Sequence, residues 1–106
     1  MKLEKRIERI EEMERCLDAS RAAVDRLEEA FEGYEAVQKD YKKLIDYYGS
    51  SRWLEDFEAD EAGKLPADLK RGVLSEDTLF DLLEENRLAA SDVLYSFAQL
   101  MSQGAL

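Results

Sequence analysis

The first half of the chain carries apolar residues at helical spacing for six to seven heptads. Steps of seven from Leu3 and from Arg6 trace two columns that behave as the a and d positions of a heptad repeat. The columns are Leu3, Ile10, Leu17, Val24, Phe31, Gln38 and Ile45, and Arg6, Met13, Ser20, Leu27, Tyr34, Tyr41 and Tyr48. Gly33, the one glycine in this stretch, costs a helix about 1 kcal/mol relative to alanine, which packing can offset. The pattern predicts a helix over about residues 2–48.

A connector of short pieces follows over about residues 50–72. Gly49 comes directly after the last periodic residue and suits a left-handed helix cap. Ser50 or Ser51 can cap a short helix that ends near Gly63. The apolar residues of that short helix are Trp53, Leu54 and Phe57. Further on, Pro66 is expected to open one helical turn that stops at Gly72.

The strongest local signal marks the start of a last helix over about residues 76–103. Ser75 takes an N-cap position, acidic residues follow in the first turn, and Leu74 is spaced to pack on Leu79. Apolar spacing then continues through Leu79, Leu82, Leu83, Asn86, Ala90, Val93, Phe97 and Leu100. No alternation typical of strands competes with this pattern. We therefore expect one all-α domain over residues 1–106, in which the long helix folds back on the last one through the connector, as a coiled-coil-like hairpin or bundle.

The lengths of the two helices have a consequence for partners. At 1.5 Å per residue the first is about 70 Å long and the last about 40 Å, so the last can cover the first only from about Tyr48 to about Ala22. The apolar residues left over are Leu3, Ile7, Ile10, Met13 and Leu17. A stripe of that length is unusual on a soluble monomer. We favour a homodimer that covers it over the alternative, a break near Ser20–Ala22 that closes a compact monomer.

Composition narrows the function. The chain has 45% hydrophobic residues, a net charge of -10, no histidine and one cysteine, Cys16. Zinc sites of the Cys/His type and nucleophiles activated by histidine cannot be built within one such chain. The excess of acid disfavours nucleic acid and anionic membranes as partners, and a lone thiol fits a reducing compartment. We expect a cytoplasmic protein without a cofactor.

A dense central signature resembles a known family. Tyr-Tyr-Gly at 47–49, Trp-Leu at 53–54, Asp-Glu-Ala-Gly-Lys-Leu-Pro at 60–66 and Lys-Arg-Gly-Val-Leu-Ser-Glu-Asp at 70–77 occur in order. They resemble a bacterial family of domains of unknown function, number 4298, whose members look like this chain throughout its length. The resemblance implies a small all-helical protein and no particular activity. The signature positions that we expect to shape the corner of the fold are Tyr48, Gly49, Trp53, Leu54, Lys64, Pro66, Arg71, Gly72 and Ser75.

An acidic cluster is the first candidate site. Its members are Glu55, Asp56, Glu58, Asp60 and Glu61. Oxygen ligands select Mg²⁺, Ca²⁺ or Mn²⁺, but Glu61 stands where a calcium loop needs its glycine and Ala67 where it needs a bidentate glutamate. An exposed helix face is the simpler interpretation. Hydrogen bonding from Tyr47 or Tyr48 into this segment is a further expectation.

Other residues have a plain structural interpretation beside a functional one. Lys64, Lys70 and Arg71 can hold an anion, but we expect them to balance nearby carboxylates. The tyrosines of the second column are expected in a core or interface rather than in a ligand pocket. Asn86 either fixes the register of a buried face or points to solvent. Cys16 is expected to be a small buried apolar residue rather than a redox switch.

Three hypotheses about function remain. The first is a non-enzymatic, homodimeric module for protein–protein interaction, with the central signature as a rigid corner or as a docking surface for another protein. The second is a metal-dependent protein centred on the cluster at 55–61. The third is an acidic mimic of nucleic acid, suggested by the net charge of -5 over residues 73–106.

Overall fold

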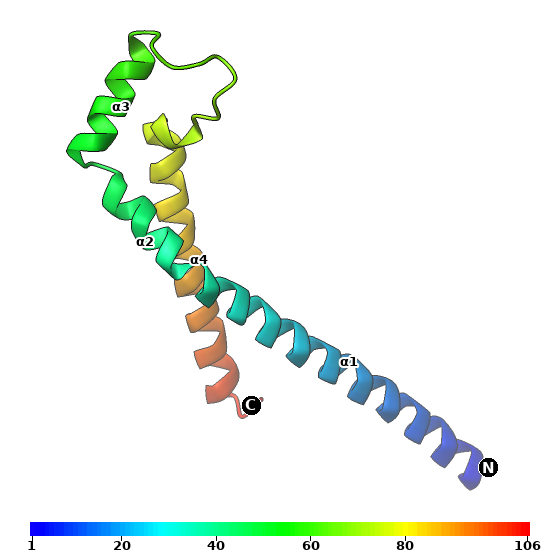
Figure 1. Ribbon diagram of the computed structural model, residues 1–106. Helices are drawn as coiled ribbons and strands as arrows, with labels where there is room; N and C mark the ends of the chain where they lie inside the picture. Colours follow the sequence, from blue (N-terminus) through cyan, green and yellow to red (C-terminus); the bar gives the residue numbers. More distant parts are fainter. The chain divides into compact units, whose positions relative to one another are not determined.

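All 106 residues are described by the computed structural model, and they form helices and turns without a strand. The α-helices are α1 (Lys2–Ala36), α2 (Gln38–Tyr47), α3 (Ser51–Glu61) and α4 (Glu76–Ser102), and a 3-10 helix, η1 (Gly72–Leu74), precedes α4 (Figure 1). The all-α prediction is confirmed. The chain divides into two units, Met1–Leu44 and Ile45–Leu106, which are described separately below.

The first unit consists of α1 and most of α2. α1 runs without interruption through Ser20–Ala22, where the compact-monomer alternative requires a break. The interruption lies instead at Val37, which separates α1 from α2. There the side-chain amide of Gln38 donates a hydrogen bond of 3.0 Å to the carbonyl of Tyr34 and satisfies one of the free acceptors at the helix end. Gln38 is also the first polar residue of its heptad column, so the apolar pattern weakens where the helix ends.

Three turns of the second unit follow the sequence signals closely. Gly49 has a φ of 82°, in the left-handed region that glycine adopts at low cost. Ser50 then caps α3, since its hydroxyl accepts a hydrogen bond from the Trp53 amide at 3.2 Å. α3 closes at Gly63, which has a φ of 70° and donates to the Asp60 carbonyl. These cap positions are as predicted.

The proline segment differs from its prediction. Pro66 does not open a helical turn, because a single bond of 3.2 Å from the Leu69 amide to the Pro66 carbonyl closes an isolated turn there. Gly72 does not end a helix but begins η1. The reason is that only Lys70 and Arg71 lie between this turn and η1, which is too few for an α-helical segment, whereas η1 places Leu74 directly before the N-cap of α4.

The second unit has a small core where α3, η1 and the start of α4 meet (Figure 1). The buried side chains are those of Trp53, Leu74 and Leu79, which are 6%, 7% and 3% exposed. The indole nitrogen of Trp53 donates a hydrogen bond of 2.9 Å to the carbonyl of Val73, so the ring is fixed by polar as well as apolar contact. These three side chains tie α3 to α4 across the connector.

The start of α4 forms as predicted. The Ser75 hydroxyl accepts a hydrogen bond of 3.3 Å from the Thr78 amide, and Leu74 and Leu79 stand at the two positions of a hydrophobic staple, both buried. At its other end α4 closes at Gly104, with a φ of 71° and a bond of 2.9 Å from the Ala105 amide to the Leu100 carbonyl.

The core generates a prediction about stability. Replacing Leu79 with alanine removes a 3% exposed side chain, which costs about 2–5 kcal/mol in protein cores. We expect the midpoint of urea unfolding, followed by circular dichroism at 222 nm, to fall strongly. The matched control is Leu94→Ala in the same helix, where the side chain is 72% exposed, so little change is expected. Equal losses for the two variants would contradict the core described here.

Candidate functional site

The first candidate is the apolar face of α1, which we call the α1 stripe. Five of its members are Leu3, Ile7, Ile10, Met13 and Leu17, with exposures of 66%, 45%, 53%, 53% and 49%. Four more residues continue it at exposures of 44–59%, namely Val24, Leu27, Phe31 and Tyr34. No residue of α1 is buried. The sequence-predicted interface residues therefore share one continuous exposed face of a single helix.

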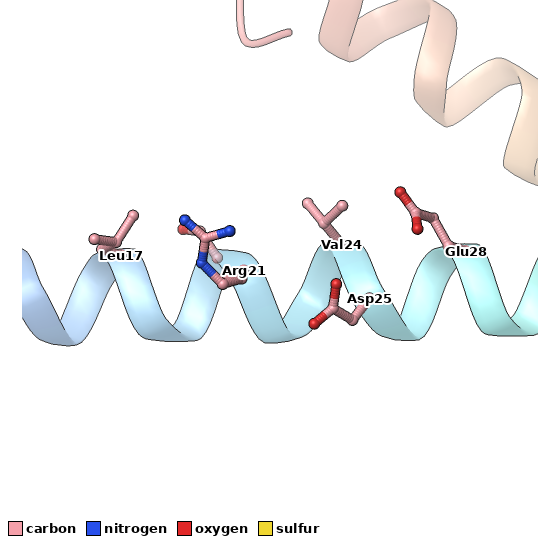
Figure 2. Close-up of a pocket in the computed structure, with 6 residues that line it drawn as sticks. Leu17, Arg21, Val24, Asp25 and Glu28 are labelled. Atoms are coloured by element: carbon pink, nitrogen blue, oxygen red, sulfur yellow. The ribbon is translucent and has the colours of Figure 1, made fainter.

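A shallow hollow lies on the same helix and belongs to this surface. It is lined by Leu17, Ser20, Arg21, Val24, Asp25 and Glu28. Leu17 and Val24 project from one side of α1, and Arg21 and Glu28 lie beside them (Figure 2). Because every lining residue comes from one helix, the hollow has no opposite wall that can hold a small ligand.

The second candidate is the corner around α3, where Tyr47 meets the acidic segment. The phenolic hydroxyl of Tyr47 donates a hydrogen bond of 2.6 Å to Oδ2 of Asp56, which confirms the expected contact. Partial burial of the phenol, together with the hydrogen bond and negative charge of Asp56, raises the pKa of Tyr47 to about 12. This pair joins the end of α2 to the middle of α3.

Aromatic packing supports the same corner. The rings of Tyr48 and Trp53 meet edge to face, with centroids 5.9 Å apart. Phe57 stacks on the other side of Trp53 at 5.2 Å, one turn further along α3. Tyr48 therefore lies in the aromatic cluster, as expected for a column of core or interface residues, whereas Tyr34 is 44% exposed on α1.

Arg71 links the connector between α3 and η1 to the end of α3. Its guanidinium donates to Oδ1 of Asp60 at the end of α3 and to the carbonyl of Pro66, and its Nε donates to the carbonyl of Leu69 at 3.3 Å. Arg71 and Asp60 are part-buried, at 32% and 25% exposure. Of the three cations considered as an anion site, Arg71 is thus paired with a carboxylate, while Lys64 and Lys70 are exposed and form no ion pair.

The acidic cluster is not gathered into a metal site. No group of three potential ligands lies close enough to hold an ion. Asp56 accepts from Tyr47 and Asp60 from Arg71, so two of the carboxylates already serve structural contacts. Glu55 and Glu58 are exposed on α3. Geometry therefore assigns the cluster to the surface of the corner.

The burial of Cys16 and of Asn86 can be compared with what the sequence predicted. Cys16 is exposed, whereas burial was expected, because the first unit contains nothing that covers α1. Asn86 is half-buried on α4, within the apolar spacing of that helix. None of the helices combines the length and apolarity needed to cross a membrane.

The sequence did not reveal the backbone acceptors of the corner. The carbonyls of Val73, Pro66 and Leu69 hold Trp53 and Arg71 in place, yet every residue has a carbonyl and none marks it in the sequence. Leu54, a signature residue, is 51% exposed beside the buried Trp53. The signature thus contains residues that build the corner and one, Leu54, that lies exposed on its surface.

The pair of Tyr47 and Asp56 predicts a pH dependence. Because the pKa of Tyr47 is raised above the ordinary value of about 10, the stability that the contact provides is complete below that pH and is lost as the pH rises to about 12. Replacing Asp56 with asparagine should lower the pKa of Tyr47, measured as the absorbance of tyrosinate at 295 nm with Tyr47→Phe subtracted. Glu55→Gln removes a neighbouring charge without this bond and is the control. An unchanged titration in Asp56→Asn would rule out the contact.

We expect the loss of Arg71 to lower the stability of the protein more than the loss of an exposed arginine does. Arg71→Ala removes charge-assisted bonds to part-buried groups and should lower the free energy of unfolding by about 1–2 kcal/mol, measured by urea denaturation. Arg87, which pairs with Glu84 at 3.0 Å and is 68% exposed, is the matched control. Arg87→Ala should change stability by less than about 0.5 kcal/mol. Equal, small losses of stability in the two variants would show that the connector does not depend on Arg71.

Comparison with known proteins agrees with the central signature. No curated protein and no solved structure matches the chain. One family model matches residues 10–96, a span that includes most of the α1 stripe, the whole corner and most of α4. The match covers most of the 106 residues, and the chain therefore belongs to the family described as a domain of unknown function, DUF4298.

Proposed function

We propose that this protein is a non-enzymatic helical module for protein–protein interaction, and that it forms a homodimer through the α1 stripe. The observation that carries the proposal is a helix of 35 residues in which no residue is buried, although one face is apolar along its length. Exposed apolar surfaces of this extent mark interaction sites. Its heptad spacing is the spacing by which helices pack on one another.

The energy of covering the stripe is sufficient in order of magnitude. Burying a large aliphatic or aromatic side chain contributes about 1.5–3 kcal/mol, so covering the exposed half of each contributes roughly 1 kcal/mol. Nine such residues on each of two helices give roughly 18 kcal/mol. Association costs about 4–15 kcal/mol in lost freedom, which leaves a net gain.

The corner supplies a rigid second surface. The Trp53 indole donates to the carbonyl of Val73 in η1, and Arg71 pairs with Asp60 at the end of α3, so η1 and the start of α4 are held against α3. Exposed apolar side chains stand around it, among them Leu54 at 51%, Val73 at 42% and Phe80 at 56%. We propose that this face docks another protein while α1 forms the dimer.

The setting of the proposal is the bacterial cytoplasm. Cys16 is a free thiol, which fits a reducing compartment, and the central signature resembles that of a bacterial family. The metal-dependent alternative lacks a supporting arrangement of ligands. The acidic charge of residues 73–106 remains the sole support for mimicry of nucleic acid, and no structural observation favours it.

The dimer is tested by placing charge on the stripe. Ile10→Glu combined with Met13→Glu should convert the protein to a monomer of 12.2 kDa, because two carboxylates on each helix cannot be buried in an apolar contact. The measurement is light scattering coupled to size exclusion. Glu8→Lys combined with Arg15→Glu, on the outward face of the same turns, is the control and should leave the dimer intact. A dimer that survives both pairs of substitutions would show that this stripe is not the interface.

A further inference from the structure

The charges along one edge of the α1 stripe point to the partner's orientation. We infer that two copies of α1 pair antiparallel, with the twofold axis crossing the helix between Asp18 and Ala19. This inference rests on the proposed homodimer. In this arrangement Glu14 of each copy lies beside Arg21 of the other, and α1 overlaps its partner over its full length.

The two edges of the stripe differ. The e column beside the a positions is largely charged, whereas the g column beside the d positions is small and apolar from Cys16 onward. The e column consists of Ile7, Glu14, Arg21, Glu28 and Glu35, and the g column continues from Cys16 through Ala23 and Ala30 to Val37. Arg21 and Glu28 flank Leu17 and Val24 on α1 (Figure 2). Neither Glu14 nor Arg21 forms an ion pair within the chain, so both are available to a partner.

Antiparallel pairing places e residues opposite e residues, and their charges select one register. With full overlap, Glu14 of one copy lies about 3 Å along the axis from Arg21 of the other, and the twofold axis repeats the pair. A shift of seven residues in one direction brings Glu14 against Glu14 of the second copy. A shift in the other direction brings Glu14 against Glu28. Both shifted registers place like charges side by side and are disfavoured.

The parallel alternative has a conflict at the d position. In register, Arg6 would face Arg6 of the second copy within the seam, and like charges at a packed position are repulsive. Its favourable edge contact is between Arg9 and Glu14. In the antiparallel register Arg6 lies instead opposite Phe31, which is 59% exposed on the single chain, and a guanidinium over an aromatic ring is attractive. The seam therefore favours antiparallel helices.

Charge exchange at the two residues tests the orientation. Glu14→Arg alone and Arg21→Glu alone should each raise the dissociation constant about 4- to 30-fold, because two attractive pairs become repulsive. The double variant should restore it, since each new arginine then meets a new glutamate. The dissociation constants are measured by analytical ultracentrifugation at low salt. Glu8→Arg, on the outward face, is the control for charge and should leave the constant unchanged, and circular dichroism checks that helicity is equal.

The outcomes separate the orientation from the dimer itself. If Arg21→Glu has no effect, and Arg9→Glu rather than Arg21→Glu rescues Glu14→Arg, the helices are parallel and the inference is overturned while the dimer stands. A wild-type protein that sediments as a monomer over the whole concentration range overturns both. If Arg21→Glu rescues the Glu14→Arg variant and Arg9→Glu does not, the result supports the antiparallel register centred between residues 18 and 19.

Discussion

A single α-helix cannot bury its own apolar face, and this constraint governs the first 44 residues. Their heptad pattern produces a regular helix, but the unit contains no second layer on which its stripe can pack. Helical propensity alone gives marginal stability in water, and tertiary packing normally supplies the rest. In this unit the packing has to come from outside it. In the proposed homodimer, folding of α1 and association would be coupled, and the stability of this unit would then depend on protein concentration.

The second unit does have a core of its own, but that core is small. Three buried side chains are few for a unit of this size, and polar contacts compensate. Tyr47 holds the end of α2 to α3, Trp53 holds α3 to η1, and Arg71 ties the loop between them to the end of α3. Each contact spans a different junction. The corner is thus fixed by bonds at its joints rather than by a large apolar interior.

Local signals predicted more than long-range ones. Caps at Gly49, Ser50 and Ser75 were predictable because capping depends on residues within one turn of each other. The contact of Tyr47 with the acidic segment followed from proximity across a short turn. The break at Val37 was not predicted, since valine is an ordinary helix residue. The hydrogen bond from the Gln38 side chain to the Tyr34 carbonyl uses a backbone acceptor, which the sequence does not mark. The prediction of a helical turn at Pro66 was wrong. The Arg71 guanidinium donates to the Pro66 carbonyl, and a backbone acceptor leaves no mark in the sequence.

The position of the one tryptophan separates the two units in an experiment. Trp53 is buried in the second unit, and the first unit contains no other indole. Its fluorescence therefore follows the opening of the corner and is silent about α1, whereas the helical signal of the chain is dominated by the longer helices. Comparing the two signals during denaturation resolves whether the units unfold together or in sequence. Trp53, one of the three buried side chains of the protein, is thus also its intrinsic fluorescent probe.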